Sequence, residues 1–295
     1  MKYRVEHQTS YTYTNPAILS CNDVCLDLRT TAWQHLLSSI WDIDPQPQTT
    51  QHHLDYFGNA WRTLSFEQAL DHLTLTVCQE VEVLERTESA ENAPLGANLI
   101  TASALSPADL IHPYLWKSPM VETGPAFATY AAPSFPQGRA LLDCVMDLTL
   151  RIFSDFTYAP ATTSIGTTTL ELLQTRHGVC QDYAHFELAV LRSIGIAARY
   201  VSGYLNTVPK LGQEKVYGAD ASHAWISVYD NQKGWVDFDP TNGIAVNDGH
   251  ITIGWGRDYG DVTPLRGVLL GGGTQTLKVM VDVRNLPDTS TEKKA

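Results

Sequence analysis

Three residues of this 295-residue chain have the side chains that nucleophilic acyl transfer requires, in the order Cys180, His223 and Asp239. Cys180 follows the glycine-containing loop "RHGV" and begins an apolar run with helical spacing. A thiol at a helix N-terminus meets the positive end of the helix dipole and unpaired N–H groups, which favour the thiolate. The same N–H groups can hold the oxyanion of a tetrahedral intermediate. We therefore predict that Cys180 is a nucleophile.

A histidine base and an orienting acid are expected on two strands that follow this helix. The segments "SHAWISVYD" and "GWVDFDP" flank "DNQKG", which is typical of a hairpin turn. Antiparallel pairing about Asn231 sets His223 opposite Asp239, on the strand face away from the apolar residues. Opposed residues have Cβ atoms ~5 Å apart, so an imidazole N–H can reach the carboxylate. A register displaced by a residue or two keeps Asp237 as the second choice.

Each of these residues also has a purely structural interpretation. Cys180 could be an inert core cysteine, His223 a strand histidine with satisfied hydrogen bonds, and Asp239 a turn acid before a proline. Their order along the chain, the shared strand face and the helix-end thiol together favour catalysis.

Bulk composition excludes several classes of partner. The net charge of -12 and the pI near 5.2 argue against nucleic acid or an anionic membrane surface as a partner. The chain shows no signal peptide and no apolar run of about 18 residues, so we expect a cytoplasmic protein. Its five cysteines fit neither a disulfide framework nor paired zinc knuckles, which agrees with a reducing compartment.

The pattern of hydrophobic residues divides the chain into two domains and a connection. Alternation predicts an N-terminal β domain over residues 1–95, and a Pro- and Ala-rich connecting segment covers 96–138. Residues 139–295 are predicted to form the catalytic domain, with helices first and C-terminal strands after. One helix is expected from Arg139. A second begins at a capping box of Thr168 and Glu171 and ends at Gly178, before the Cys180 helix.

At these residues the chain resembles the bacterial transglutaminase-like superfamily, which includes putative cysteine proteases. "GVCQDYA", "SHAWISVYD" and "GWVDFDPTNG" look like the three signature segments of the core, and "YRVEHQTSYTY", "DYFGNAW" and "GRDYGDVTPLRGV" are similar to the rest of the family. The resemblance implies Cys180 as nucleophile, His223 as base and Asp239 as its partner. It also implies an α+β fold, with a papain-like core of helices packed on an antiparallel sheet and an N-terminal β-sandwich-like domain.

The expected activity is that of a transglutaminase-like cysteine peptidase or amidase, acting on a peptide or amide substrate without a cofactor. The sequence lacks the large flanking β domains of animal transglutaminases, and no clustered acidic loop for calcium is found. Hydrolysis is therefore favoured over a true transglutaminase reaction. A non-catalytic peptide-binding module on the same scaffold is the third alternative, although it would need no complete triad.

Other polar and aromatic residues have weaker assignments. Tyr158 and Trp225 could line the acyl-binding cleft, and a donor near Tyr158 could complete the oxyanion hole, although aromatic residues on strands are more often core. His177 and His185 flank the cysteine but lie at poor angles for a shared metal, so none is expected. The run Arg257-Asp258-Tyr259 could be a cleft rim or a structural ion pair on a loop.

Overall fold

The computed structural model describes residues 1–86, 110–160, 166–207 and 221–287. Its strands are β1 (Lys2–Val24), β2 (Gln34–Asp44), β3 (Thr49–Leu54), β4 (Ala60–Phe66), β5 (Leu70–Val83), β6 (Thr157–Tyr158), β7 (His177–Gly178), β8 (Ala198–Leu205), β9 (Ser222–Asp230), β10 (Gly234–Asp239), β11 (Ile244–Ala245), β12 (His250–Gly256), β13 (Leu265–Gly271) and β14 (Gln275–Leu286). Its helices are α2 (Pro125–Ala131), α3 (Leu141–Asp155), α4 (Thr169–Thr175) and α5 (Cys180–Ser193), with short 3-10 helices η1 (His112–Tyr114), η2 (Ala132–Ser134) and η3 (Tyr259–Asp261).

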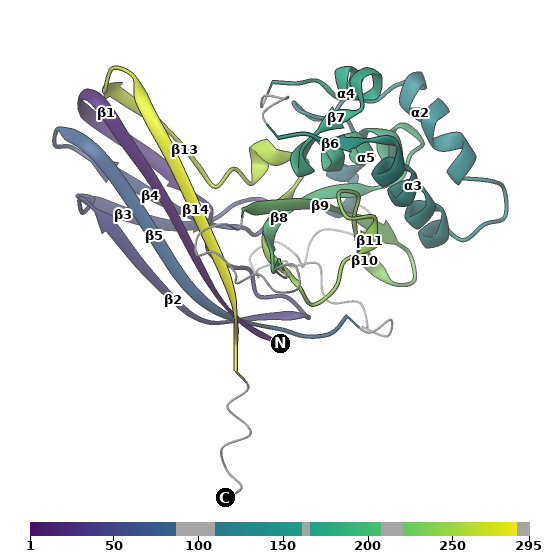
Figure 1. Cartoon of the computed structure of the whole chain (residues 1–295), viewed down its shortest axis with the longest axis horizontal. Coiled ribbons are helices and arrows are strands. Elements are labelled where there is room, and N and C mark those ends of the chain that lie inside the picture. The colour runs from purple at the N-terminus through teal and green to yellow at the C-terminus, as the bar shows by residue number, and fades with distance from the viewer. Residues whose placement is uncertain (87–109, 161–165, 208–220, 288–295) are drawn as a thin grey trace, which may run out of the picture.

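The long strand β1 organises the N-terminal lobe, a curled antiparallel sheet with the path β2-β5-β1-β4-β3. The first half of β1 pairs with β5 and β14, and the second half pairs with β4 and β13. Residues alternate in and out along β1, so Tyr3, Val5 and His7 are all buried, as the period of two predicts. Figure 1 shows β14 beside β1, although the two strands come from opposite ends of the chain.

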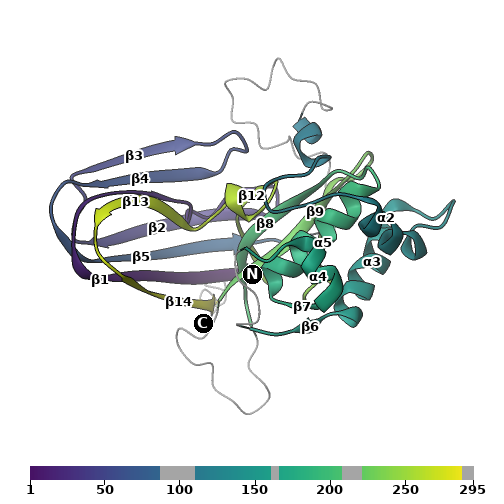
Figure 2. The same ribbon diagram turned by 90° about the horizontal axis from the view of Figure 1, so that it is seen from above.

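The second lobe carries the helices on a five-stranded antiparallel sheet with the order β11-β10-β9-β8-β12. Helix α5 packs against β9 and β8, while α2, α3 and α4 pack against α5. Figures 1 and 2 show the helices on the side of this sheet that faces away from the N-terminal lobe. The core between them is aromatic and aliphatic and includes Phe186, Leu188 and Ile226, none of which is exposed. The expected fold class is confirmed.

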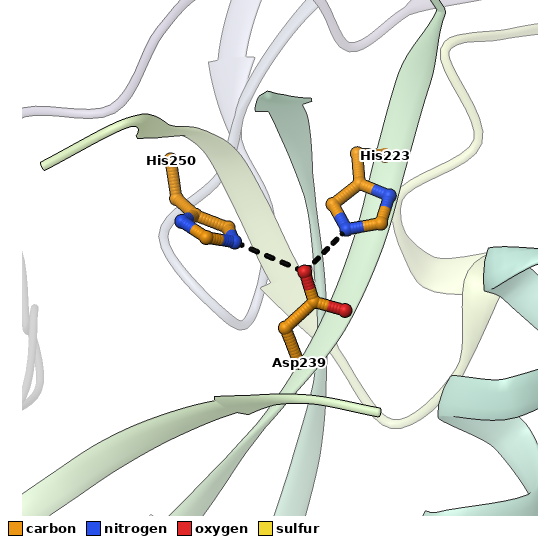
Figure 3. A group of neighbouring side chains, drawn as sticks. All are labelled: His223, Asp239 and His250. Carbon is orange, nitrogen blue, oxygen red and sulfur yellow. Dashed lines mark hydrogen bonds and ion pairs between the residues drawn. The ribbon is translucent and has the colours of Figure 1, made fainter. Parts of the chain in front are cut away.

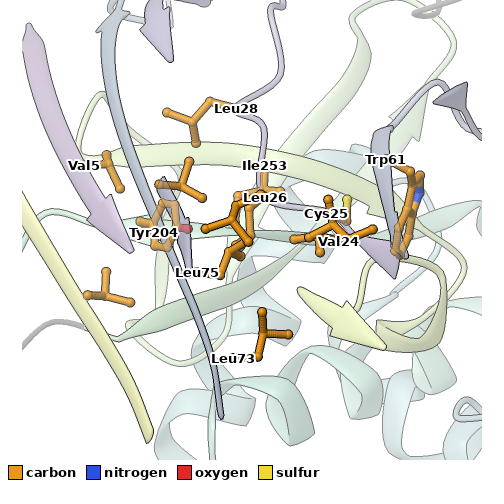
Figure 4. Packing of buried hydrophobic residues seen from close by; sticks show 14 of the residues in the cluster. Val5, Val24, Cys25, Leu26, Leu28, Trp61, Leu73, Leu75, Tyr204 and Ile253 are labelled. Atoms are coloured by element: carbon orange, nitrogen blue, oxygen red, sulfur yellow. The ribbon is translucent and has the colours of Figure 1, made fainter. Parts of the chain in front are cut away.

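A second hydrophobic cluster is formed by residues of both lobes. Tyr204 of β8 and Ile253 of β12 lie among Val5, Leu26 and Leu75 of the N-terminal lobe (Figure 4). The hydroxyl group of Tyr204 is also 2.7 Å from Nδ1 of the buried imidazole of His7. A hydrophobic core common to both lobes resists their separation, because separation would expose these side chains to water.

Most of the expected elements are present, with two differences. The capping box of Thr168 and Glu171 begins α4, as predicted, but the helix ends at Thr175 because Arg176 adopts the left-handed conformation with φ 53°. Gly178 instead lies in β7, which pairs with β6. The C-terminal strands differ more, because β13 and β14 belong to the N-terminal sheet rather than to the catalytic domain. Strand periodicity shows which face is buried but not which sheet the strand joins.

The expected connecting segment over residues 96–138 lies partly outside the described residues, as does its boundary with the N-terminal domain. Its described part, residues 110–138, contains η1, α2 and η2, and the side chains of Phe127 and Tyr130 pack in the core against α5. This part of the segment therefore packs with the second lobe.

The edge strand β12 is fixed to the N-terminal lobe by backbone hydrogen bonds to a buried side chain. The amide oxygen of Gln34 accepts a 2.7 Å hydrogen bond from the N–H of Thr252, and its amide nitrogen donates to the carbonyl oxygen of Thr252 at 2.7 Å. The backbone N–H of Arg29 donates to the same carbonyl oxygen. Farther along β12, the N–H of Trp255 donates to the side chain of Asn59. Groups of the N-terminal lobe thus satisfy backbone hydrogen bonds at the edge of the second sheet that would otherwise be unpaired.

The substitution Gln34→Ala is expected to lower the free energy of unfolding by about 2 kcal/mol, because it leaves the N–H of Thr252 buried without an acceptor. Urea denaturation measures this change. Gln48→Ala is the matched control, since Gln48 is exposed and water can replace its bond to the N–H of Glu67. We expect the control to change stability by less than about 0.5 kcal/mol. Equal losses in both variants would contradict a structural role for Gln34.

Candidate active site

Cys180 is the first residue of α5, where the helix N-terminus meets the end of the second sheet. Val179 before it is extended, and its N–H donates to the carboxylate of Asp182 at 2.9 Å, which helps to start the helix. A Cβ atom at Gly178 would lie 2.7 Å from the Cβ of Asp182, so this approach requires glycine. Cys180 itself is partly exposed. A nucleophile in this position can meet a substrate.

His223 and Asp239 are joined directly, as predicted. The Nε2 atom of His223 lies 2.7 Å from Oδ2 of Asp239 (Figure 3). The observed register differs from the expected one by two residues, because Asp237 lies opposite Ser227 rather than opposite Trp225. A shift of two residues keeps every side chain on its own face of the sheet, so the carboxylate still reaches the imidazole diagonally.

The carboxylate of Asp239 is completely buried and receives hydrogen bonds on both oxygen atoms. The backbone N–H groups of Thr241 and Asn242 donate to Oδ1 at 2.9 and 3.2 Å. The side-chain amide of Asn242 donates to Oδ2 at 2.7 Å, and Nε2 of His250 lies 3.1 Å from the same atom. Sequence reasoning missed His250 and Asn242. Only the turn residue Asn242 had a local signal, as it lies three residues after the predicted acid and Asx residues favour such turns.

These contacts shift the protonation equilibria in opposite directions. Burial alone would lower the pKa of His223, but hydrogen bonds to Asp239 and to Cys180 outweigh it and raise this pKa to about 10. Burial would raise the pKa of Asp239, but the hydrogen bonds from His223, His250 and Asn242 hold it well below its ordinary value. Together these shifts favour a protonated imidazole beside an ionised carboxylate at neutral pH.

Asp237, the second choice for the acid, has other partners. Its Oδ2 atom lies 2.5 Å from Nη1 of Arg86, and Nε1 of Trp225 donates to it at 3.3 Å. The positive charges of Arg86 and Arg199 lower the pKa of Asp237 against the opposing effect of burial. Among the described residues, therefore, Asp239 rather than Asp237 contacts the candidate base.

Comparisons with known proteins assign the family. A model of the transglutaminase-like superfamily matches residues 132–240, and one of the bacterial transglutaminase-like N-terminal region matches residues 3–82. An uncharacterized protein of Mycobacterium tuberculosis is 37% identical over 302 residues, covering 96% of this chain and 92% of the relative. The chain belongs to the transglutaminase-like superfamily.

Two further proteins are similar to this chain, one over nearly its whole length and one over a quarter of it. A crystal structure of a "putative cysteine protease" from Cytophaga hutchinsonii superposes with a TM-score of 0.74 at 20% identity, covering 99% of this chain and 92% of that one. A protein-glutamine gamma-glutamyltransferase of Pseudomonas aeruginosa is 41% identical over 78 residues, which are 25% of this chain and 11% of the relative. The first similarity shows a shared fold over nearly the whole length.

The two residues predicted to bind substrate occupy different environments. Tyr158 is 53% exposed. Partial burial is the main cause that raises the pKa of its phenol, and the negative charge of nearby Cys180 raises it further. Trp225 has no exposed surface, and its ring lies 6.1 Å from that of His223, in space left open by the missing side chain of Gly203. Substrate contact stays a prediction for both, and only Tyr158 offers an accessible surface.

One group of described residues has the ligand types of a metal site, namely His223, Asp239 and His250, whose donor atoms all lie within 4.8 Å. However, the 2.7 and 3.1 Å separations from Oδ2 are hydrogen-bond distances, with a proton between the atoms. A metal ion would have to replace both protons. His177 and His185 do not join this group: His177 contacts the carbonyl group of Thr175, and His185 accepts from the N–H of Tyr259.

The run from Arg257 to Tyr259 forms a tightly bonded loop. Arg257 binds the carboxylate of Asp261 with two nitrogen atoms, each at 2.9 Å, and the carboxylate of Asp258 accepts from the N–H of Met120 at 3.0 Å. The N–H of Tyr259 donates to His185 of α5. These contacts favour the structural interpretation of the run.

No helix in the described part of the chain is long and apolar enough to cross a membrane.

Brief iodoacetamide treatment near neutral pH is expected to label Cys180 at least about tenfold faster than the other cysteines. Burial raises the pKa of Cys25 to about 12 and also raises that of Cys144, while Cys21 and Cys78 lie half-buried on strands away from any helix N-terminus. Peptide mapping by mass spectrometry measures the order of labelling. Faster labelling of Cys21 or Cys78 would contradict an activated thiol at the start of α5.

Proposed function

We propose that this transglutaminase-like protein hydrolyses an amide or peptide bond through a thioester on Cys180. The observation that carries the proposal is the 2.7 Å contact between His223 and the buried carboxylate of Asp239, with Cys180 close enough to His223 to raise the pKa of the imidazole. Each member has the surroundings that its role needs: a partly exposed thiol, a largely buried imidazole and a fully buried, hydrogen-bonded acid.

The reaction uses the two ring nitrogens of His223 separately. Nε2 bonds Asp239, which leaves Nδ1 for the thiol. His223 takes the proton of Cys180, and the thiolate attacks the carbonyl carbon to form a tetrahedral intermediate. Its C–N bond then breaks, and the amine leaves with the proton from His223. Water deprotonated by His223 attacks the thioester, releasing the acid and restoring the thiol. The Asp239 carboxylate stabilises the imidazolium throughout.

Charge on the oxyanion is stabilised at the start of α5. The first N–H groups of an α-helix have no acceptor within the helix, so the start of α5 can offer donors beside the thiol. Near Cys180, the exposed Tyr158 can contribute a hydroxyl donor, and we include it as a substrate-binding residue on this ground. Preorganised donors of this kind stabilise the developing charge without the reorganisation that water would require.

The alternative is acyl transfer to an amine, which is supported by the partial similarity to the glutamyltransferase of Pseudomonas aeruginosa. Both reactions pass through the same thioester and differ in what attacks it. A transferase must exclude water, which is present at tens of molar, and hold an amine near the acyl carbon. The sequence has no evident feature dedicated to holding an amine, so we favour hydrolysis. A peptide-binding module without catalysis would not need the buried Asp239.

The two aspartates of β10 provide a matched test of the triad. Once a peptide screen has supplied a substrate, Cys180→Ala and His223→Ala should each abolish turnover. Asp239→Asn should lower kcat/KM by about 10³-fold or more, since the amide cannot stabilise the imidazolium. Asp237→Asn removes a largely buried charge from the same strand, but Asp237 contacts Arg86 and not His223, so a loss of less than about tenfold is expected.

Thermal melting of each variant shows whether the fold is retained, and kinetics are compared only among folded variants. A greater loss of turnover in Asp237→Asn than in Asp239→Asn would contradict the assignment of the acid. Full turnover in Cys180→Ala would contradict the proposed function itself.

A further inference from the structure

We propose that His250 is a positioning residue for this reaction, holding Oδ2 of Asp239 opposite His223 from a strand outside the Asp239 turn. The catalytic importance of His250 rests on the proposed function, whereas its contact with Asp239 is a feature of the structure. Both imidazoles approach the same oxygen atom through Nε2, at 2.7 Å from His223 and 3.1 Å from His250 (Figure 3). Whatever fixes His250 therefore also restricts where that oxygen can lie.

The imidazole of His250 is fixed independently of Asp239. It has no exposed surface, and its ring lies 5.3 Å from the ring of Trp225 in an edge-on arrangement. Its Nδ1 atom lies 3.4 Å from the backbone nitrogen of Asn247 and 3.2 Å from the side-chain Oδ1 of the same residue. Burial lowers the pKa of His250, although the hydrogen bond to Asp239 and the charge of this carboxylate act in the opposite direction. Asn247 thus offers Nδ1 both a backbone donor and a side-chain acceptor, while Nε2 faces the carboxylate of Asp239 and donates to it.

The other bonds to Asp239 do not provide the same constraint. The N–H groups of Thr241 and Asn242 and the Asn242 amide all come from the turn that directly follows Asp239, so they move together with it. His250 comes instead from β12, at the far edge of the sheet. It is the one donor among the described residues that ties the carboxylate to an element other than its own turn and the His223 strand.

Strand β12 is in turn held by the N-terminal lobe through Gln34, Arg29 and Asn59. His250 is its first residue and pairs with Leu205 of β8, two residues before the doubly bonded Thr252. The position of the imidazole therefore depends on the docking of the N-terminal lobe. This arrangement gives the N-terminal lobe a direct structural link to the candidate active site.

The test compares two amide variants that differ by one methylene group. The amide nitrogen of Gln corresponds to Nε2 of histidine and can reach Asp239, whereas that of Asn corresponds to Nδ1 and cannot. The readout is the rate of Cys180 alkylation by iodoacetamide across the pH range, which needs no substrate. Failure of this test is thus distinct from failure to find a hydrolytic activity. Thermal melting reports the stability of each variant.

The ionisable groups around the cluster are Cys180 and Glu187 from α5, Asp239 from β10, and Arg86 after β5. In the wild-type protein, His223 should stay protonated until the pH approaches its raised pKa of about 10. The alkaline limb of the profile, where the alkylation rate of Cys180 changes as His223 loses its proton, should therefore lie near that pH. If His250 positions the carboxylate, its loss weakens the bond to His223, and the limb moves to lower pH.

We expect His250→Gln to stay within about twofold of wild type at every pH. His250→Asn should lower the plateau rate by about tenfold and move the alkaline limb down by half a pH unit or more. His7→Phe is the control, since His7 is a buried imidazole that contacts Tyr204 and not Asp239, and it should lower stability without moving the limb.

Three outcomes would overturn the proposal. Equal profiles for the Gln and Asn variants would mean that the donor at Nε2 has no role, and an unchanged profile in His250→Asn would mean that the residue is only structural. A shift of the limb to higher pH would mean that His250 withdraws charge from the carboxylate rather than positions it.

Discussion

A fully buried carboxylate is the constraint on which the candidate active site depends. Asp239 has no contact with water, and an ionised acid in that position is stable only if its oxygen atoms are hydrogen-bonded. The structure supplies five such bonds, from a turn, from an amide and from two imidazoles on different strands. Removing a donor weakens the stabilisation of this buried charge. The positions of β9, β10 and β12 are therefore linked through one side chain.

This constraint gives the N-terminal lobe a role beyond its own stability. The second sheet ends at β12, and an edge strand that carries His250 must be held in register if the imidazole is to reach Asp239. The buried amide of Gln34 fixes that register by bonding both backbone groups of Thr252. The shared hydrophobic core around Tyr204 and Ile253 fixes the same strands from the other side. The two lobes thus form one structural unit around the site.

The sequence predicted the three central residues because each carries a local signal. Cys180 begins an apolar helical run, and a recognisable turn lies between the strands of His223 and Asp239. The hairpin register was wrong by two residues, yet the predicted contact is present because a strand has a period of two. His250 could not be found in this way. It reaches Asp239 only because β12 pairs with β8, a long-range pairing that no short-range pattern encodes.

The same limit explains the misplaced C-terminal strands. The segment "TLKVMVDV" is expected to be a C-terminal strand, and it lies in β14, where Val281 and Val283 are buried but Leu277 and Val279 are exposed. The pattern does not indicate that this strand pairs with β1. The paired residues Tyr13 and Gln275, for example, are more than 260 residues apart in the sequence. Periodicity describes one strand and its faces, whereas sheet membership depends on which other surfaces are left to cover.

The central claim is that an acyl group is carried on Cys180 and passed to water. It is tested most directly by acid-quenching the protein with a pool of peptide amides and measuring adducts by mass spectrometry, with and without a millimolar primary amine. We predict a hydroxylamine-labile thioester on Cys180 that is absent from His223→Ala, and hydrolysed acid as the main product even when the amine is present. A predominant amine conjugate would contradict hydrolysis and establish the transferase, and an adduct on any other residue would contradict Cys180 as the nucleophile.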